Sequence, residues 1–431
     1  MENLLDFFSF SDPNVRYVVF GSILLSASSA LVGCFTFLKK KALVGDAVAH
    51  SVLPGVCLAF LISGTKNPLW LVIGAFITGW ISLVLIDFIT SRSKIKEDTA
   101  IGLILSVFFG VGILFLTMIQ HSGNANQSGL DDILFGNAAS LIGNDLIVFT
   151  ALAIVLIFII LLFFKEFTIL CFDEEFAKAI GFPVRRIELM LTTLTVLAVV
   201  TGIQAIGAIL MAAILITPAA AARFWTDKLR VMIVLAAVMA AFSGLIGAYI
   251  SYIAPGMPTG PWIVMVISII AIFSFLAAPK KGIIFRQIAL RKMKHKMNDE
   301  NVLKLLFQMG ESPDTDYYFP RTINDIIDKR PFHPPVLQNT LKRLKRDGFL
   351  EENEEYWKFT KAGKDKGQRV TRLHRLWELY LTKYLRIAPD HVHEDAESIE
   401  HIITPELERR LEAVLENPEL DPHDSVIPGR N

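Results

Sequence analysis

An acid and an imidazole lie four residues apart inside an apolar stretch of the sequence. Asp46 and His50 fall within residues 43–63, where a buried charge is costly unless it has a function. If this stretch is helical, both side chains project from one face, about 40° and one turn apart. A carboxylate with an imidazole suits manganese, iron or zinc, whereas calcium and magnesium prefer oxygen ligands alone. The pair therefore predicts a path for a transition-metal ion; the alternative is that the two side chains only hydrogen-bond to each other.

A second set of possible metal ligands lies near the C-terminus. His374 and Glu378 are four residues apart, and a later run of four ligands repeats at helical spacing. That run falls within an arc of about 100° on a helix. Six nitrogen and oxygen ligands on two helices indicate a transition-metal site, although a charged, solvated helix also shows such spacing by chance. The six residues are His374, Glu378, His393, Glu397, Glu400 and His401.

The charges divide the chain into two unlike parts. Overall, 42 basic residues balance 42 acidic ones, but residues 1–279 hold only 15 and 16 of them, and residues 280–431 hold 27 and 26. The low charge of the first part is typical of a helical membrane protein, in which each span needs roughly 20 apolar residues. The second part has the composition of a soluble domain. The zero net charge therefore excludes neither a membrane protein nor contact with nucleic acid.

The apolar part is expected to be an all-α polytopic membrane domain with about eight or nine transmembrane helices. The sixth and seventh candidate spans are short and meet at Thr201–Gln204, and the seventh contains Pro218, so broken or re-entrant helices are expected there. The candidate spans are residues 16–38, 43–63, 69–90, 99–119, 145–165, 187–202, 205–222, 231–253 and 260–279.

Basic clusters follow alternate spans and set the expected orientation. Because loops rich in Lys and Arg stay in the cytoplasm, the N-terminus is expected outside and the C-terminal part in the cytoplasm. Asp87, the other acid inside a span, is expected to pair with nearby Arg92. The clusters are residues 39–41, 92–96, 178–186, 223–230 and 280–286.

The charged part begins with a basic juxtamembrane linker, residues 281–297, expected to contact anionic lipid headgroups. Residues 298–364 are predicted to form a winged-helix domain, with three helices followed by a pair of strands. Four basic residues on the third helix suit phosphate contact, so DNA binding is one interpretation and a solvated helix face the other. They are Lys342, Arg343, Lys345 and Arg346.

Residues 15–280 resemble the permease subunits of ATP-binding-cassette importers for manganese, zinc and iron. The resemblance rests on Gly45–Gly55, on Asp173–Gly181, and on Gly202–Ala208 with Leu215–Ala220. It implies a metal-binding protein outside the cytoplasm, and a homodimer or a pair with a second permease. It also implies that the segment with Asp173, Glu174, Ala177 and Gly181 docks on an ATP-binding subunit.

The chain is not expected to be an enzyme. It has no Gly-x-x-x-x-Gly-Lys-Ser/Thr loop, so ATP hydrolysis is expected in the separate subunit. A membrane metalloenzyme is the less supported interpretation, because Asp46 and His50 lack a closed ligand set and a nearby general base. No organic cofactor is expected.

Residues 298–429 resemble the diphtheria-toxin-repressor-like metalloregulators, through Arg375–Leu381, Val392–His401 and Asp421–Gly429. The resemblance implies that residues 365–431 form a helical metal-sensing and dimerisation domain with the six ligands given above. Glutamate at position 397 resembles the manganese-sensing branch. Relatives also take ligands from the first helix of the winged domain, where this chain has Asn301, a poor ligand, and Lys304, a competing cation.

Together these features predict that residues 1–280 form the permease of an ATP-driven metal importer in a bacterial inner membrane. Manganese is the expected metal, with iron and zinc as the other candidates. The cytoplasmic domain is expected to sense the metal and to regulate transport or transcription. The alternative is a membrane-anchored, metal-dependent transcription regulator, although nine spans and a buried Asp/His pair exceed what an anchor needs.

Overall fold

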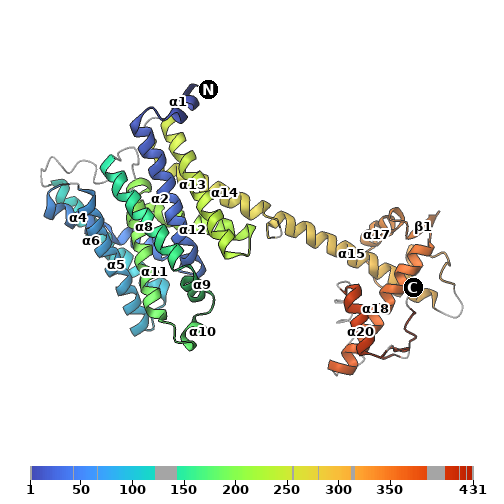
Figure 1. Ribbon diagram of the computed structural model, residues 1–431. Coiled ribbons are helices and arrows are strands. Elements are labelled where there is room, and N and C mark those ends of the chain that lie inside the picture. Colours follow the sequence, from blue (N-terminus) through green and yellow to red (C-terminus); the bar gives the residue numbers. More distant parts are fainter. Residues whose placement is uncertain are drawn as a thin grey trace. The chain divides into compact units, whose positions relative to one another are not determined.

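The computed structural model describes most of the chain. It divides into two compact units, Met1–Phe285 and Arg286–Asn431, each with a hydrophobic core of its own. Helices make up nearly all of the first unit, and the second adds one pair of strands (Figure 1). The described residues are 2–41, 43–65, 67–121, 143–254, 257–279, 281–311, 316–385, 403–416, 418–423 and 425–429.

The first unit is an all-α membrane domain, as predicted. Within the described residues, seven stretches are long and apolar enough to cross a membrane, and α8 with α9, which bend by 67°, make an eighth. The seventh expected span, 205–222, coincides with α12, whose apolar stretch Leu210–Trp225 is shorter than the others. The helices are α1 (Glu2–Ser9), α2 (Pro13–Leu38), α3 (Val44–Ser51), α4 (Leu53–Ser63), α5 (Pro68–Arg92), α6 (Glu97–His121), α8 (Gly143–Leu162), α9 (Phe164–Phe172), α10 (Glu174–Ala179), α11 (Val184–Ile206), α12 (Ala208–Trp225), α13 (Leu229–Ile253) and α14 (Thr259–Ala277).

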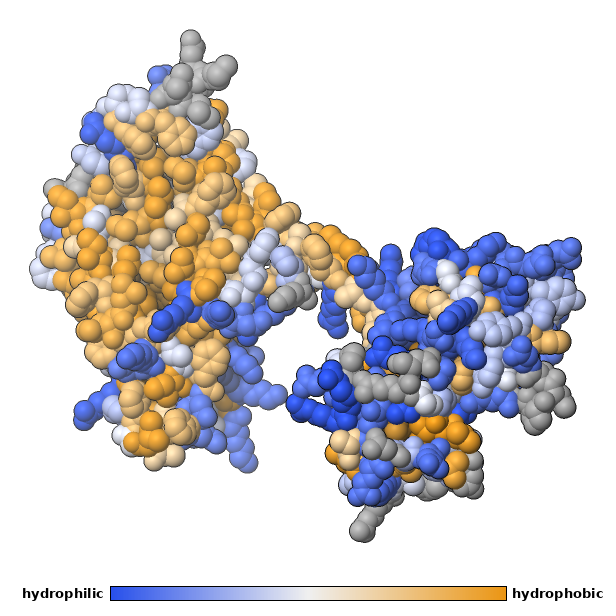
Figure 2. All heavy atoms as spheres, turned by 45° about the vertical axis from the view of Figure 1, so that its right-hand side comes forward, coloured by the Kyte–Doolittle hydropathy of each residue, from blue (hydrophilic) through white to orange (hydrophobic). Residues whose placement is uncertain are grey.

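The outer surface of this unit is apolar, which matches a lipid environment. Large side chains such as Ile62, Phe158 and Val234 are exposed, and Figure 2 shows a nearly continuous apolar surface over the unit. A water-soluble protein rarely exposes so large an apolar surface. Helices suit this environment because they satisfy their backbone hydrogen bonds internally.

Two of the helix boundaries in the membrane unit are of interest, at Gly207 and at Phe163. The break expected at Thr201–Gln204 lies instead at Gly207, whose φ of +93° is a conformation open to glycine and strained for other residues. Helix α11 therefore continues to Ile206 before α12 begins. The second break, at Phe163, produces the bend between α8 and α9 and has neither Gly nor Pro at that position.

Glycines allow helices of the membrane unit to approach closely. A Cβ atom placed on Gly33 of α2 would lie 1.7 Å from the carbonyl oxygen of Leu215 in α12. In the same way, a Cβ on Gly55 of α4 would lie 2.1 Å from the carbonyl oxygen of Gly74 in α5. Small residues at such crossings let backbones touch, which is how helices pack where no hydrophobic effect drives them together.

We expect Gly33→Ala to destabilise the membrane unit, because the added methyl group meets backbone that cannot rotate away. The loss in unfolding free energy should be about 1–3 kcal/mol, the usual range for overpacking. A denaturing-detergent titration of the purified protein would measure it. Gly102→Ala in α6, where nothing lies within 4 Å of the new Cβ, is the matched control and should change little.

The second unit begins within α15 (Ile283–Gly310), and most of the basic stretch 281–297 is helical. Strands β1 (Leu350–Asn353) and β2 (Tyr356–Phe359) pair antiparallel, with Leu350 opposite Phe359. The core joins α15 to the next two helices and to the strands through Leu306, Leu341 and Trp357. The remaining helices are α16 (Ile323–Lys329), α17 (Pro334–Arg346), α18 (Lys361–Leu385) and α20 (Pro405–Val414).

Arginines on α18 hold the C-terminal segment in place. Arg375 pairs with Glu311 at 2.6 Å and donates to the carbonyl oxygen of Val426 at 2.6 Å. Arg372 pairs with Glu412 of α20 at 2.7 Å. These arginines are largely buried, so their pairs exclude water and count for more than surface ion pairs. Helix α18 is thus the central support of the C-terminal part of this unit.

Candidate metal centres

Asp46 and His50 lie together on α3, as their spacing predicts. Oδ1 of Asp46 is 3.5 Å from Nε2 of His50. Asp46 is in the first turn of the helix, where the helix dipole favours a carboxylate, and His50 is in the last turn. Both side chains project from one face of α3 and can bind one ion.

The imidazole of His50 is held by packing and keeps one nitrogen free. Its ring meets the ring of Phe109 on α6 edge-on, with 5.1 Å between the ring centroids. Its Nδ1 is buried and has no hydrogen-bond partner among the residues that the structure describes. A buried ring nitrogen without a partner is uncommon in proteins, and this one lies on the side of the ring away from the Nε2 that faces Asp46.

One chain supplies only part of a metal site here. No group of three His, Cys, Asp or Glu side chains forms around a common point in the described part of the chain. The ion pair expected between Asp87 and Arg92 is also wrong: the Arg92 guanidinium lies over the ring of Phe88, 5.5 Å from its centroid. Asp46 and His50 therefore remain the candidate ligands of the membrane unit.

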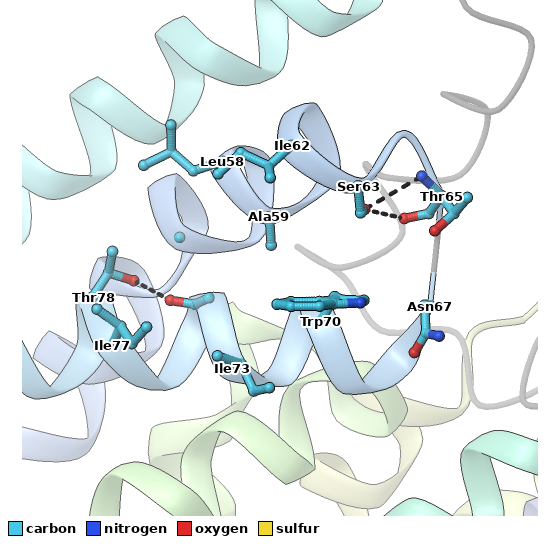
Figure 3. Close-up of a pocket in the computed structure, with 12 residues that line it drawn as sticks. Leu58, Ala59, Ile62, Ser63, Thr65, Asn67, Trp70, Ile73, Ile77 and Thr78 are labelled. Atoms are coloured by element: carbon cyan, nitrogen blue, oxygen red, sulfur yellow. Dashed lines mark hydrogen bonds between the residues drawn. The ribbon is translucent and has the colours of Figure 1, made fainter.

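A cavity of about 510 Å³ lies between α4 and α5 (Figure 3). Its wall is mainly apolar, with Trp70 along one side and the polar side chains of Ser63 and Asn67 at one end. The Ser63 hydroxyl donates to the carbonyl oxygen of Thr65 at 2.9 Å. The described residues that line this cavity include no His, Cys, Asp or Glu, and the cavity is distinct from the Asp46–His50 pair.

The segment from Asp173 to Gly181 forms the short helix α10 with defined ends. Oδ1 of Asp173 caps it by accepting from the backbone N–H of Phe176 at 2.8 Å. Gly181 ends the segment in the left-handed region, with φ +78°. Ala177 is fully buried, so its side chain packs against the rest of the unit and is not exposed for contact with another protein.

The outer side of this segment carries an apolar face that the sequence analysis missed. Phe172, Phe176 and Ile180 repeat every four residues, and each is more than half exposed. An exposed apolar patch of this kind marks a contact with protein or membrane. Their spacing was visible in the sequence, but only the structure shows that these side chains point outward.

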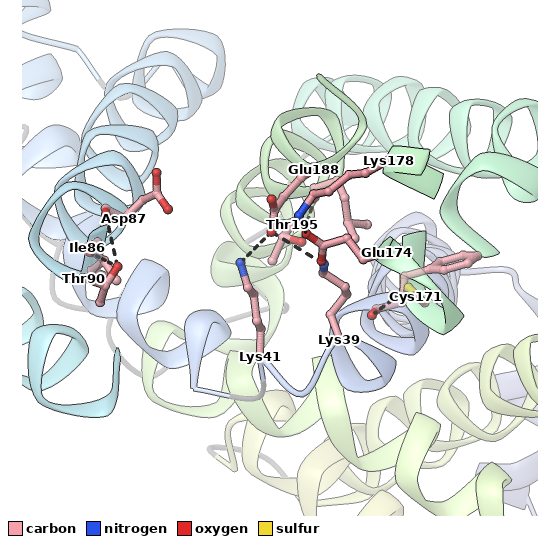
Figure 4. Close-up of polar contacts among 12 residues, drawn as sticks. Lys39, Lys41, Ile86, Asp87, Thr90, Cys171, Glu174, Lys178, Glu188 and Thr195 are labelled. Carbon is pink, nitrogen blue, oxygen red and sulfur yellow. Dashed lines mark hydrogen bonds and ion pairs between the residues drawn. The ribbon is translucent and has the colours of Figure 1, made fainter. Parts of the chain in front are cut away.

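Ion pairs join α10 to the segment between α2 and α3 (Figure 4). Nζ of Lys39 lies 2.8 Å from Glu174 of α10, and Nζ of Lys41 lies 3.0 Å from Glu188 of α11. Lys178 completes the group by pairing with Glu174 at 2.8 Å. The hydrogen bonds from Lys178 and Lys39 lower the pKa of Glu174 to about 2. We call these five residues the lysine–glutamate network.

In the second unit, two of the six predicted metal ligands are described and lie together. His374 and Glu378 are buried on α18, with 3.1 Å between Nε2 and Oε1. On the opposite side of the ring, Nζ of Lys304 in α15 lies 3.4 Å from Nδ1 of His374. The other predicted ligands, His393, Glu397, Glu400 and His401, lie outside the described residues.

The basic side chains of α17 are mostly engaged within the protein. Arg343 forms a bidentate ion pair with the carboxylate of Asp299, with N–O distances of 2.6–3.0 Å. Lys345 pairs with Glu352 at 2.8 Å, and Arg346 with Asp347 at 3.2 Å. Lys342 is exposed and has no ion pair in the part of the chain that the structure describes. Phosphate contact through Arg343, Lys345 or Arg346 would therefore compete with these ion pairs.

The membrane unit matches a known transporter family. The model of the ABC 3 transport family matches residues 11–278. The chain belongs to this family. The manganese transport system membrane protein MntC of Bacillus subtilis is 41% identical over 377 residues, 87% of this chain and 86% of that protein. The zinc transport system membrane protein TroC of Treponema pallidum is 41% identical over 277 residues, 64% of this chain and 93% of TroC.

A solved structure agrees with this assignment. A chain of the PsaBC complex from Streptococcus pneumoniae, at 33% identity, superposes with a TM-score of 0.60 and covers 67% of this chain and 99% of that one. At the other end, the model of the iron-dependent repressor metal-binding and dimerisation domain matches residues 360–429. This ABC 3 member is therefore a multi-pass membrane protein with a repressor-like C-terminal domain. The transport-family match disfavours the interpretation of the apolar half as a mere anchor.

The depressed pKa of Glu174 predicts how the lysine–glutamate network responds to acid. Since the pKa falls from its ordinary 4.5 to about 2 in the folded protein, the stabilising effect is complete above about pH 4.5 and is lost toward pH 2. Glu174→Gln should therefore lower the melting temperature equally from pH 8 to about pH 5, with a difference that narrows below about pH 4.5. Thermal unfolding in detergent across this range is the measurement, and Glu175→Gln is the control. A difference that grows on acidification would contradict the assignment.

Proposed function

We propose that this ABC 3 family member is the membrane permease of an ATP-driven importer for a divalent transition metal, with manganese as the first candidate. The Asp46–His50 pair carries the proposal, because it lies within the 268 residues, 11–278, that match a transport family. Relatives named for manganese and zinc transport support this class of substrate. Iron remains a third candidate, because its ligand preferences overlap with theirs.

The chemistry of the pair suits a metal in transit. Asp46 supplies charge, and His50 supplies a nitrogen that discriminates against calcium and magnesium. Two ligands from one chain are too few to replace the water shell of the ion. A second copy of the chain, or a second permease, would bring the set to four around a common axis. Partial coordination also favours release, which a transport path requires.

The orientation follows from the basic clusters. The positive-inside rule places the N-terminus outside a bacterial inner membrane, and it places Lys39, Lys41, α10 and the C-terminal unit in the cytoplasm. The ATP-binding subunit would then dock against α10, through Phe172, Phe176 and Ile180. A metal-binding protein would deliver the ion on the opposite side. Residues 281–297 would contact anionic lipid headgroups on the cytoplasmic side.

The lysine–glutamate network provides a route from the ATPase to the metal. Glu174 of α10 holds Lys39 at the end of α2, and Glu188 of α11 holds Lys41. Asp46 follows Lys41 by five residues and lies in the first turn of α3. A displacement of α10 by nucleotide-driven movement of the ATPase would therefore pull directly on the start of the helix that carries both metal ligands.

The C-terminal unit would regulate transport in response to metal. Its match to a metal-binding and dimerisation domain supports sensing, with His374, Glu378, His393, Glu397, Glu400 and His401 as ligands. Action on DNA through a winged helix is the second candidate, since three helices precede the β1–β2 hairpin. The engagement of Arg343 with Asp299 favours regulation of transport, because DNA contact would require this pair to open.

We expect Asp46→Asn and His50→Ala each to reduce manganese uptake by about tenfold or more, because each removes half of the ligand set. Uptake of radioactive manganese by cells that rely on this transporter is the measurement, and immunoblotting of membranes confirms normal protein levels. His121→Ala is the matched control, since His121 is exposed and, within the described residues, contacts the carbonyl oxygen of Thr117 alone. Normal uptake by both path variants would refute the proposed path.

The docking face of α10 makes a separate prediction. Phe176→Ala and Ile180→Ala should weaken binding of the ATP-binding subunit, because each removes exposed apolar area from the contact. Co-purification of the two subunits and manganese-stimulated ATP hydrolysis are the measurements. Phe158→Ala, on the lipid-facing side of α8, removes a similarly exposed ring and should leave both unchanged. Equal effects at the two positions would contradict the docking assignment.

A further inference from the structure

Lys304 is the most deeply buried lysine among the described residues, and its position coincides with the candidate sensor site. The residue is only 2% exposed. Its ammonium group lies 3.4 Å from Nδ1 of His374, whose Nε2 lies 3.1 Å from Glu378. Burying a charge is unfavourable unless partners compensate for the lost water. Lys304 therefore contacts a side chain that is predicted to hold a metal.

The side chains differ in how well they suit a metal ion. His374 and Glu378 provide an imidazole nitrogen and a carboxylate, which suit manganese, iron or zinc. Asn301, one turn before Lys304 on α15, has a buried Oδ1 with no hydrogen-bond partner in the described part of the chain. Lys304 does not fit, because an ammonium has three N–H donors and no lone pair, and because it repels a divalent cation.

We propose that the Lys304 ammonium is a built-in competitor of the metal in the C-terminal unit. It places a positive charge beside Nδ1 of His374, on the opposite side of the ring from Glu378. A metal ion reaches Nδ1 of His374 only after Lys304 has moved away. This inference rests on the proposed metal site of that unit, but not on the transport path through Asp46 and His50.

The competition sets the metal concentration to which the unit responds. The apparent affinity equals the intrinsic affinity multiplied by the fraction of molecules in which the competitor has left the site. With Lys304 in place, this fraction is small, so the site fills only at high metal concentration. A sensor with that property responds after import has succeeded, which is the behaviour that feedback on an importer requires.

Manganese binding to the full-length protein in detergent tests the competition. The His50→Ala background removes the transport-path site, and electron paramagnetic resonance reports the free manganese ion directly. Adding Lys304→Met, which keeps the length of the side chain and removes its charge, should tighten binding about tenfold or more. Lys366→Met is the matched control: Lys366 lies on α18 and pairs with Glu300 at 3.3 Å instead of contacting His374. Its affinity should equal that of the parent.

The outcomes separate this inference from the transport function. Loss of the gained affinity when His374→Ala is added to Lys304→Met supports competition at this site. Equal affinity of Lys304→Met and the parent, or no binding by either, overturns it. Manganese uptake by the protein with an intact Asp46–His50 pair is measured separately and would stay normal in those cases, so the transport proposal would stand.

A measurement on the unsubstituted protein covers the case in which Lys304→Met does not fold. Reductive methylation followed by mass spectrometry reports the exposure of each lysine amine. Lys304 should be protected without metal, because it is buried, and should become labelled at saturating manganese as the ion displaces it. Continued protection of Lys304 while manganese is bound at His374 would overturn the proposal.

Discussion

The structure depends on the high free energy of a charged group that is removed from water. In the membrane unit, this constraint restricts the spans to apolar helices and leaves Asp46 and His50 on α3 as an exceptional pair. In the C-terminal unit, the same constraint governs Lys304, which is buried against His374. Asp46 lies against His50, and Lys304 lies against His374, so each charged group has a polar partner.

Much of the membrane unit could be predicted from the sequence, because its signals are local. Apolar stretches long enough to cross a bilayer are visible in a single chain, and the spacing of Asp46 and His50 fixes their common face once the helix is assumed. The bend at Phe163 was not predictable, since no Gly or Pro marks it. Nor was the failure of Asp87 to meet Arg92, because the nearby ring of Phe88 offers the guanidinium an alternative partner.

Contacts between distant segments lay beyond what the sequence could predict. Lys39 and Glu174 are 135 residues apart, and Lys304 and His374 are 70 apart. A resemblance to metalloregulators drew attention to Lys304 as a departure from the ligand pattern, but not to its contact with His374. The engagement of Arg343 by Asp299 likewise depends on how α15 packs against α17. Such pairings follow from tertiary packing, which hydropathy and residue spacing do not encode.

The contact of Gly33 with the backbone of Leu215 limits how the permease can change conformation. Because there is no room for a side chain between α2 and α12, these helices cannot slide past each other without losing the fit, and they must move as one rigid body. Helices α4 and α5 are joined in the same way by Gly55 and Gly74. Opening the path to one side of the membrane and then to the other would therefore use hinges outside these two helix pairs, such as the boundary between α11 and α12 at Gly207.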